Sequence, residues 1–334
     1  MREHLKRILA RSHGKTVLVL GDLMLDEYIW GKVNRISPEA PIPIVEVQSV
    51  SLAPGGACNV AANIAKLGGK VALVGVIGKD DSGERLKDEL ISRGISTDFL
   101  IEDPSRPTTL KTRIIAHSQQ MVRTDRESRS PVNDLVAARI LSVVSDLLAG
   151  VDCIIISDYG KGVVEPTLAE RIIALVRTAE RPITIDPKGQ DYSKYRNATI
   201  VTPNKAEAAQ AARVDIKDAS SLIAAGNALL KQLSCEAVLI TRGEEGMSLF
   251  EANGRQTHLP TFARQVYDIT GAGDTVIGTL SLALTTGATL VECANIANHA
   301  AGLVVGKIGT ASVTGEELEA ELEKDDRVWH QDET

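Results

Sequence analysis

Short apolar runs alternate with amphipathic stretches along most of the chain. The apolar runs are rich in β-branched residues, and they predict strands at Thr16–Gly21, Val71–Ile77, Cys153–Ser157, Ile183–Asp186, Thr199–Thr202 and Ala237–Thr241. Apolar residues at helical spacing predict helices between them, at Ala57–Leu67, Gly83–Arg93, Val132–Leu148, Pro166–Ala179 and Ala219–Leu233. Apolar strands separated by helices are typical of a parallel sheet that is covered on both faces. We therefore expect an α/β fold with a mostly parallel central sheet.

Two segments, at about residues 27–50 and 108–126, depart from this alternation of strands and helices. The first contains three prolines and then alternates polar with apolar residues, and the second alternates in the same way. Such alternation indicates exposed antiparallel strands that do not belong to the buried sheet. We interpret the two segments as a small β-sheet lid, inserted into a single domain that spans residues 1–334. The alternative is a pair of surface hairpins without a function. Residues 316–326 predict a last helix, followed by a solvated acidic tail.

Composition and charge narrow the function. The 334 residues are 43% hydrophobic and 24% charged, as in a folded protein with a large core. A net charge of −7 and 3% aromatic residues argue against a nucleic-acid-binding surface. The chain contains no apolar run near the roughly 18 residues of a membrane span, and Val17–Leu20 is too short for a signal-peptide core. We expect a cytoplasmic protein that binds neither nucleic acid nor membranes.

Cysteine and histidine spacing offers no metal site. The four cysteines, at positions 58, 153, 235 and 293, form no Cys-x-x-Cys pair, and the six histidines show no ligand or triad spacing. We expect four buried thiols rather than a zinc site or a disulfide framework.

The most informative stretch is DITGAGD at residues 268–274, which runs into an Ala- and Leu-rich helix. Gly271 and Gly273 permit a tight turn, so the peptide N–H groups of residues 271–274 can converge at the N-terminus of the helix. Such an end suits a phosphate or a developing anion. Asp274 is then either an ordinary N-cap or a base, and the helix dipole favours its ionised form, as a base beside a transferring phosphoryl group requires.

Two further motifs carry candidate binding groups. Gly55 and Gly56 permit close approach of the backbone to a ligand, and Asn59 offers a donor and an acceptor at the start of a helix. The alternative is a glycine-rich helix entry with an amide cap. Asp22 and Asp26 follow the first strand, where ligands bind in open α/β sheets, and their carboxylates suit sugar hydroxyls. The alternative is a turn Asp followed by a capping Asp.

The motifs together resemble a known family. GGACN (55–59) and DITGAGD (268–274) are similar to the two signature motifs of the ribokinase-like (PfkB) carbohydrate kinases. The resemblance covers about residues 15–320, and within the family it points to the bacterial kinases that act on a heptose phosphate. Ile269 and Thr279 depart from the usual pattern, but neither departure removes a functional group. The stretches that extend the resemblance are NRISPEAPIPIVEV (34–47), SDYGKG (157–162), IDPKG (185–189), TPNKAE (202–207), TRGEEGM (241–247) and VVGKIGT (304–310).

The resemblance implies a role for each matching residue. It implies that Asp274 is the catalytic base and that Gly271, Ala272 and Gly273 form an anion hole. The positions that match sugar-binding residues are Asp22, Asp26, Gly55, Gly56 and Asn59. The positions that match the ATP site are Asn204, Lys205, Ala206 and Glu207 in an N-x-x-E pattern, together with Thr241, Gly243 and Asn298, and Glu207 belongs to the magnesium shell. Lys111, Arg123 and Lys188 are our candidates for holding a phosphate, and for Lys188 a solvated loop lysine is the alternative.

The implied protein is an ATP- and Mg²⁺-dependent sugar kinase with a β-lid, and monovalent-cation activation is left open. By the same resemblance, its substrate is D-glycero-β-D-manno-heptose 7-phosphate, phosphorylated at O1 for ADP-heptose and lipopolysaccharide synthesis. We also expect a homodimer that forms through the lid strands, because exposed strand edges favour pairing. The alternatives are a kinase for another sugar, a non-catalytic sugar- or nucleotide-sensing module, and part of a bifunctional enzyme. An adenylyltransferase half needs an H-x-G-H motif, which does not occur in this sequence.

Overall fold

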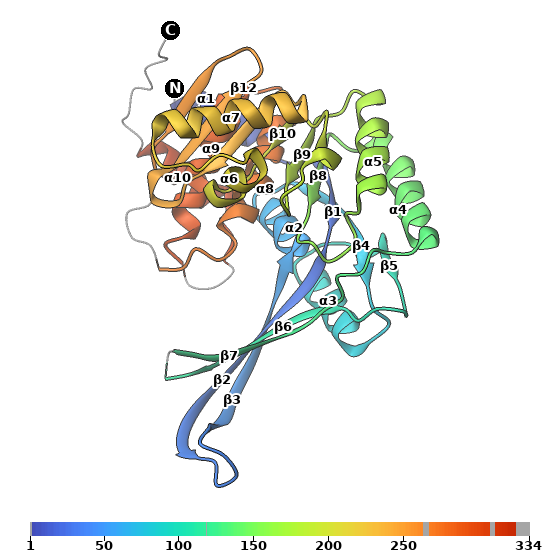
Figure 1. Cartoon of the computed structure of the whole chain (residues 1–334), viewed down its shortest axis with the longest axis vertical. Coiled ribbons are helices and arrows are strands. Elements are labelled where there is room, and N and C mark those ends of the chain that lie inside the picture. Colours follow the sequence, from blue (N-terminus) through green and yellow to red (C-terminus); the bar gives the residue numbers. More distant parts are fainter. Residues whose placement is uncertain (1, 118, 263–266, 308–310, 325–334) are drawn as a thin grey trace.

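A nine-stranded sheet crosses the body of the molecule in the computed structural model, which describes residues 2–117, 119–262, 267–307 and 311–324 (Figure 1). The strand order is β13-β12-β11-β10-β9-β8-β1-β4-β5. All neighbours from β11 to β5 are parallel, and β12 and β13 are antiparallel. The strands are β1 (Thr16–Gly21), β4 (Lys70–Ile77), β5 (Leu100–Glu102), β8 (Cys153–Ser157), β9 (Ile183–Asp186), β10 (Ile200–Val201), β11 (Ala237–Thr241), β12 (Met247–Glu251) and β13 (Gln256–Leu259).

Helices cover both faces of this sheet, because successive side chains of each strand point to opposite sides. Val17 and Val19 of β1 pack into one core, and Leu18 and Leu20 pack into the other. The first core is closed by α1 (Arg2–Ser12), α2 (Ala57–Lys66), α3 (Asp81–Ser92), α8 (Ala272–Leu284), α9 (Leu290–Val304) and α10 (Gly315–Glu323). The second is closed by α4 (Asp134–Leu147), α5 (Pro166–Thr178), α6 (Lys205–Ala212) and α7 (Ala219–Leu233). The expected α/β fold is confirmed.

Two secondary-structure features of the body were not predicted from the sequence. Helix α1 was not predicted, although Leu5 and Ile8, which it buries, have helical spacing. The hairpin of β12 and β13 at the sheet edge was also missed. The expected last helix is present as α10, and the tail from residue 325 lies outside the described residues, as does the end of the VVGKIGT stretch at 308–310. All four cysteines are buried with free thiols. Within the described ranges, every helix falls short of the length and hydropathy that a membrane span requires.

A second sheet of four strands projects from the body and forms the lid (Figure 1). Its order is β3-β2-β6-β7, with β2 (Leu23–Ile36), β3 (Pro43–Gly56), β6 (Thr109–Ala116) and β7 (Gln119–Arg126). The pairs β2–β3 and β6–β7 are antiparallel as expected, but the central pair β2–β6 is parallel. The reason is that the first strand of each hairpin leaves the body in the same direction. The first hairpin also reaches from Leu23 to Gly56, beyond the expected bounds.

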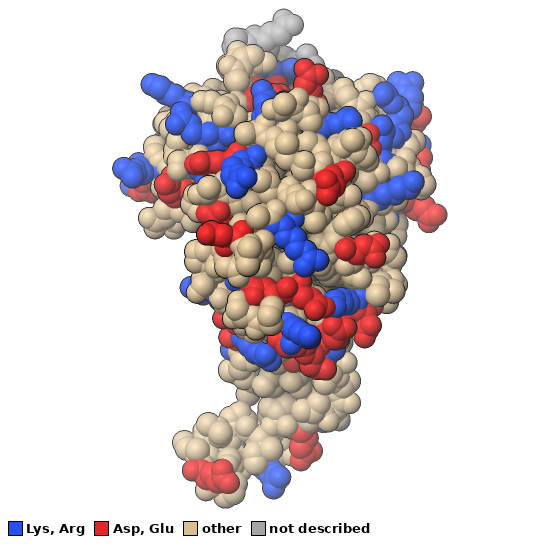
Figure 2. Space-filling view, turned by 90° about the vertical axis from the view of Figure 1, so that its right-hand side faces the viewer, with Lys and Arg blue, Asp and Glu red and all other residues tan. Residues whose placement is uncertain are grey.

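The lid is held to the body by charged pairs. Arg85 of α3 binds Glu27 of β2 with an N–O distance of 2.6 Å, and Lys161, after β8, binds Glu127, after β7, at 2.6 Å. Figure 2 shows charged side chains gathered where the lid joins the body, whereas the far part of the lid is largely uncharged on this face. Leu23 and Leu25 of β2 also pack into the first core, so the junction combines charged pairs with apolar packing, whereas the outer lid exposes apolar side chains.

Candidate active site

The order of the strands places a crevice between β1 and β8. From β1 the chain continues to β4 and β5 on one side, whereas β8 leads to β9, β10 and β11 on the other. In open α/β sheets, ligands bind at the carboxyl ends of the strands where the order reverses. A cleft of about 180 Å³ lies at this edge of the sheet, lined by Asp158, Tyr159, Asp186, Pro187, Lys188, Thr202, Asn204, Glu207, Thr241 and Gly273.

The N-terminus of α8 faces this cleft through Gly273. Gly271, the N-cap of α8, has a left-handed backbone with φ of 79°, and a Cβ there would lie 2.7 Å from the Nδ2 atom of Asn59. Only glycine therefore fits between the turn and Asn59. The Ala272 N–H donates to the carbonyl of Ile269 at 3.2 Å, so it is already engaged in a turn. Of the expected anion hole, Gly273 is thus the residue that lines the cleft.

Asp274 lies in the first turn of α8 and is 5% exposed. The Asn59 amide donates to Oδ2 at 2.6 Å, and the Tyr159 hydroxyl donates to Oδ1. Burial raises the pKa of Asp274 to about 6, and the nearby Asp26 carboxylate acts in the same direction, whereas the bonds from Tyr159 and Asn59 lower it. The expected ionised form of Asp274 at neutral pH is compatible with this pKa, and the contribution of the helix dipole stays a prediction. The carboxylate is poised to exchange a proton near neutral pH.

Asp22 does not face the cleft. It is 1% exposed, and its carboxylate accepts the backbone N–H groups of Tyr159, Lys161 and Val163 at 2.8, 3.0 and 3.2 Å. Burial raises its pKa, and the Asp158 carboxylate adds to this effect. The sugar-binding role that the resemblance implies for Asp22 stays a prediction. Its carboxylate anchors the loop that follows β8.

The other residues of the sugar motifs surround Asp274. Asp26 is 4% exposed and accepts from Arg113 at 2.6 Å. A Cβ on Gly55 would lie 2.5 Å from Asp26 Oδ2, and one on Gly56 would lie 2.6 Å from the Asp22 carbonyl oxygen. These positions therefore have no room for a side chain, and the expected approach of the two glycines to a ligand stays a prediction. Asn59, in α2, has its amide N–H committed to Asp274.

The N-x-x-E pattern forms a capping box at the start of α6. The Asn204 side chain accepts the Glu207 N–H at 2.9 Å, and the Glu207 side chain accepts the Asn204 N–H at 3.1 Å. Glu207 Oε1 also accepts from Lys188 Nζ at 2.7 Å. The box is thus structural, and it also presents both side chains to the cleft. Lys188, whose side chain is 50% exposed, is an ion-pair partner and not a free loop lysine.

The remaining predicted nucleotide residues divide into two groups. Thr241, at the end of β11, lines the cleft. Lys205, which binds Glu245 at 3.3 Å, and the exposed Ala206 and Gly243 do not appear among its lining residues. Asn298 is 3% exposed and donates to the Pro260 carbonyl at 2.8 Å. It fixes the chain after β13, and its place beside a nucleotide base stays a prediction.

The lid cations lie in ion pairs. Arg123 makes two bonds to Asp125, at 2.9 and 3.1 Å, and Lys111 approaches Asp125 at 3.5 Å. Arg113, which was not selected from the sequence, is the lid cation that contacts Asp26, and it also lies 5.2 Å from the centre of the Tyr28 ring. Its alternation within the second lid segment was visible, but nothing in the pattern indicated its partner.

Comparison with known proteins identifies the family. A family profile described as pfkB family carbohydrate kinase matches residues 15–316. The chain belongs to this family. Its members are ATP-dependent phosphotransferases, so the expectation of a carbohydrate kinase is confirmed, and the alternative of a non-catalytic sensing module is set aside.

Curated relatives cover nearly all of this chain. The chain is 46% identical over 321 residues to the Bifunctional protein HldE of Geotalea uraniireducens (strain Rf4), covering 96% of this chain and 66% of that protein. It is 45% identical over 317 residues to the protein of the same name from Geobacter metallireducens (strain ATCC 53774 / DSM 7210 / GS-15), covering 95% and 65%. The chain therefore spans about two thirds of the length of the curated relatives that it matches.

Solved structures show the same fold. Phosphofructokinase-2 from Escherichia coli in complex with potassium matches with a TM-score of 0.77 at 18% identity, covering 93% of this chain and 100% of that chain. Arabidopsis thaliana ribokinase complexed with ribose and ATP matches with a TM-score of 0.73 at 20% identity, covering 94% and 100%. The ribokinase-like fold with its separate four-stranded sheet is thus confirmed.

Two functional candidates in the cleft were missed in the sequence. Asp186 is the last residue of β9, and burial raises its pKa well above the usual value, with further contributions from the Asp274 and Glu207 carboxylates. Tyr159 follows β8 and contacts Asp274. Both residues lie within stretches that supported the family resemblance, and their position at or after the ends of strands of a parallel sheet is the signal that would have found them.

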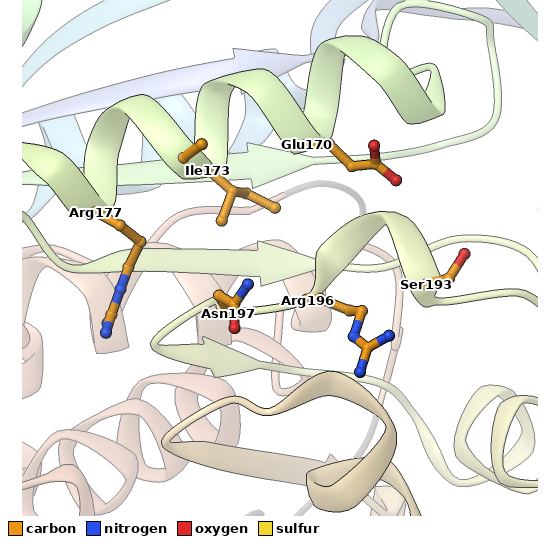
Figure 3. A pocket seen from close by; sticks show the side chains of 7 residues that line it. Glu170, Ile173, Arg177, Ser193, Arg196 and Asn197 are labelled. Atoms are coloured by element: carbon orange, nitrogen blue, oxygen red, sulfur yellow. The ribbon is translucent and has the colours of Figure 1, made fainter.

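A larger hollow, of about 370 Å³, lies between α5 and the short helix Ser193–Tyr195 (Figure 3). Glu170 and Arg177 line it from α5, and Arg196 and Asn197 line it from the opposite segment (Figure 3). Arg177 is paired with Glu236 at 2.9 Å. None of the residues selected from the sequence lines this hollow. We therefore assign the chemistry to the cleft at the carboxyl ends of the strands.

The environment of Asp274 makes a prediction about stability. Folding raises its pKa from 3.8 to about 6, so between these values the folded protein binds more protons than the unfolded chain. The free energy of unfolding therefore falls as pH rises through this window. Asp274→Asn has no carboxyl group to titrate at this position, so its free energy of unfolding should not fall for this reason. The free energy of unfolding of the variant minus that of the wild type should therefore rise by about 2–3 kcal/mol from about pH 4 to about pH 7. Urea unfolding at a series of pH values measures this difference.

Asp152→Asn is the matched control for this experiment. The pKa of Asp152 is lowered overall by its bonds to the Thr16 N–H and to Lys15, which outweigh its burial. Its contribution to stability is present above its unfolded pKa and is lost only at lower pH. The difference between this variant and the wild type should therefore stay flat over the same range. A flat difference for Asp274→Asn would contradict the raised pKa.

Proposed function

We propose that this chain transfers the γ-phosphoryl group of ATP to O1 of D-glycero-β-D-manno-heptose 7-phosphate, for ADP-heptose and lipopolysaccharide synthesis. The observation that carries the proposal is a buried carboxylate, Asp274, at the start of a helix whose first turn faces the cleft. The heptose is supported by the similarity to HldE proteins and by the stretches NRISPEAP and SDYGKG. Because the relatives are longer than this chain, their complete activity is not transferred to it.

The chemical step assigned to Asp274 is proton acceptance. The sugar O1–H gives its proton to the Asp274 carboxylate, the O1 oxygen forms a bond to the γ-phosphorus, and the bond from that phosphorus to the bridging oxygen breaks to release ADP. With a pKa of about 6, Asp274 is largely ionised at neutral pH and can accept this proton. The N–H groups in the first turn of α8, around Gly273, are placed to stabilise the charge on the transferring group.

The acidic side of the cleft fits a magnesium ion. Asp186 and Glu207 offer carboxylate oxygens, and burial raises the pKa of Asp186, with the Asp274 and Glu207 carboxylates acting in the same direction. No cluster of three or more His, Cys, Asp or Glu residues suited to a metal occurs in the part of the chain that the structure describes. This donor set suits Mg²⁺, which keeps several waters and binds through one or two carboxylates and the substrate phosphates. When bound, Mg²⁺ neutralises charge on the phosphates.

The ATP phosphates are assigned to the side of the cleft formed by Asn204, Thr241 and Lys188. Lys188 supplies the positive charge on this side, and if a phosphate replaced Glu207 as its partner, the ammonium group would remain paired. The sugar phosphate is assigned to the lid, where Lys111 and Arg123 stand in the ion pairs described above. Monovalent-cation activation stays a prediction.

A substrate panel tests the proposal. Initial rates of ADP release should give the highest kcat/KM with the heptose 7-phosphate, with ribose, fructose 6-phosphate and tagatose 6-phosphate as competitors. A preference of about tenfold or more corresponds to roughly 1.4 kcal/mol of transition-state discrimination. A higher kcat/KM with another sugar would replace the heptose by that sugar and retain the kinase.

Asp274→Asn tests the assigned base. The variant cannot accept the proton, so kcat should fall by about 10²–10⁴-fold, whereas sugar and ATP binding, measured by calorimetry, should be largely kept. Retained binding shows that the fold and the cleft are intact. Turnover close to that of the wild type would remove Asp274 from the mechanism.

The lid supports a proposed homodimer. Because the lid is only one layer thick, several of its large apolar side chains are exposed, for example Ile36 at 60% and Val47 at 59%. β3 and β7 are edge strands with unpaired backbone groups on their outer sides. A second copy of the lid would cover these side chains, and exposed apolar side chains that gather on one element favour an interaction site.

Val47→Lys tests the dimer. A charge on this exposed face should shift the protein toward monomer in sedimentation velocity, because burying an unpaired charge at an interface is costly. Leu135→Lys is the matched control, since Leu135 is 84% exposed on α4, away from the lid, and the change should leave the assembly as it is. Equal sedimentation of both variants and the wild type would contradict a lid-mediated dimer.

A further inference from the structure

The loop after β8 connects three parts of the site. Its Tyr159 hydroxyl donates to Oδ1 of Asp274, and the Tyr159 side chain lines the cleft. Asn59 occupies the other oxygen, Oδ2. Tyr159 is therefore the donor to Asp274 that itself lines the cleft, next to Gly273 of the same helix turn as Asp274.

The backbone of this loop is held by a buried carboxylate. Asp22 accepts the N–H groups of Tyr159, Lys161 and Val163, so alternate residues of the loop are bound to one side chain that is 1% exposed. Breaking these bonds would leave a buried acceptor without partners, which costs free energy. The loop is therefore rigid at the residue that carries the phenol.

Further bonds fix the same loop from both ends. Asp158, 3% exposed, accepts from Lys194 and from Tyr195, each at 2.6 Å. At the other end, the Lys161 carbonyl accepts from Arg106 at 2.5 Å. The Lys161 ammonium group lies 2.6 Å from the carboxylate of Glu127, at the end of the lid. These contacts tie the loop to the body and to the base of the lid, so Tyr159 does not depend on its own side-chain packing alone for its position.

We propose that Tyr159 is a positioning residue that holds Asp274 oriented and ionised while Asp274 accepts the proton of the sugar hydroxyl. The inference rests on the proposed function. The phenol keeps its own proton throughout and donates one hydrogen bond, and the proton from the sugar goes to a remaining lone pair of the carboxylate. The rigid loop favours this lasting role over that of a cap that the sugar must displace.

Electrostatics explains why Asp274 needs such a donor. The carboxylates that raise its pKa or interact with it are Asp26 in β2 and Asp186 at the end of β9. Asp158 and Glu207 act on Asp186 in turn. The nearby cations, Lys188 and Lys194, are paired with Glu207 and Asp158. Arg113 is likewise paired with Asp26, so a neutral donor can stabilise the Asp274 carboxylate where these neighbouring cations are already engaged. Burial and Asp274 itself raise the pKa of Tyr159 well above its usual value, so the phenol remains a donor.

Tyr159→Phe tests the proposal, because it removes the donor and keeps the ring. A hydrogen bond to a charged acceptor contributes enough to move a pKa by about one to two units. The acidic limb of the kcat–pH profile should therefore shift upward by about one pH unit or more, with a larger loss of kcat at about pH 6 than at about pH 8. KM for the sugar should change little, since Tyr159 acts through Asp274.

Tyr192→Phe is the matched control. Tyr192 is fully buried beside Tyr195, and its hydroxyl has no hydrogen-bond partner among the described residues. The change removes a phenol oxygen from the same region without touching Asp274, and it should leave the acidic limb where it is. An equal shift in both variants would assign the effect to packing and overturn the proposal.

A second measurement keeps the test independent of turnover. Asp274→Asn is placed in the Tyr159→Phe background, and the pH dependence of its effect on the free energy of unfolding is compared with that in the wild type. If Tyr159 lowers the pKa of Asp274, the window in which the two curves diverge should extend upward by about one pH unit or more. This readout needs no substrate, so it separates failure of the inference from failure of the proposed function.

The outcomes divide clearly. The positioning role is overturned if Tyr159→Phe shifts neither the acidic limb of the kcat–pH profile nor the pH window of the stability difference. Faster ATP hydrolysis without sugar in Tyr159→Phe, with both in place, would identify Tyr159 as a displaceable cap and also overturn it. If the heptose is not the accepted sugar, the pH profile is measured with the sugar that the panel selects.

Discussion

A carboxylate that is nearly removed from water must be compensated by hydrogen bonds, and the site around Asp274 is organised by this requirement. Asn59 from α2 and Tyr159 from the loop after β8 donate to its two oxygens, so elements far apart in sequence must meet at the start of α8. The glycine at 271 permits the approach of Asn59. The result is a group whose pKa of about 6 lies near working pH, which suits a base but costs stability when it is ionised.

A second constraint is the excess of acidic groups at the carboxyl ends of the strands. Asp22 and Asp158 are satisfied by loop N–H groups and by Lys194, and they build the walls of the site. Asp186 and Glu207 line the cleft, where we propose that a magnesium ion and the ATP phosphates bind. The same residue type therefore serves structure or chemistry according to its partners, and burial alone does not tell the two roles apart.

The lid follows a different principle. A single layer of four strands has two faces and two edges, and the body covers only the inner end of the layer. Charged pairs join the lid to the body, whereas its outer part exposes apolar side chains. This separation suits the proposed lid, whose base would contact a polar substrate and whose outer part would contact the lid of a second copy. It also connects the lid to the loop of Tyr159, because Lys161 of that loop binds Glu127 beside the last lid strand.

The sequence by itself determined the parallel sheet, most of its helices, the lid segments and the glycine turn before Asp274, because periodicity and turn residues are local properties. It also placed the candidate groups after strands, where the topology collects them. Only the tertiary structure decided the partners: Asp22 binds a loop, Asn59 and Tyr159 bind Asp274, and Arg113 binds Asp26. These contacts join residues about 90 to 220 positions apart, and no local pattern encodes which buried donor will meet which carboxylate.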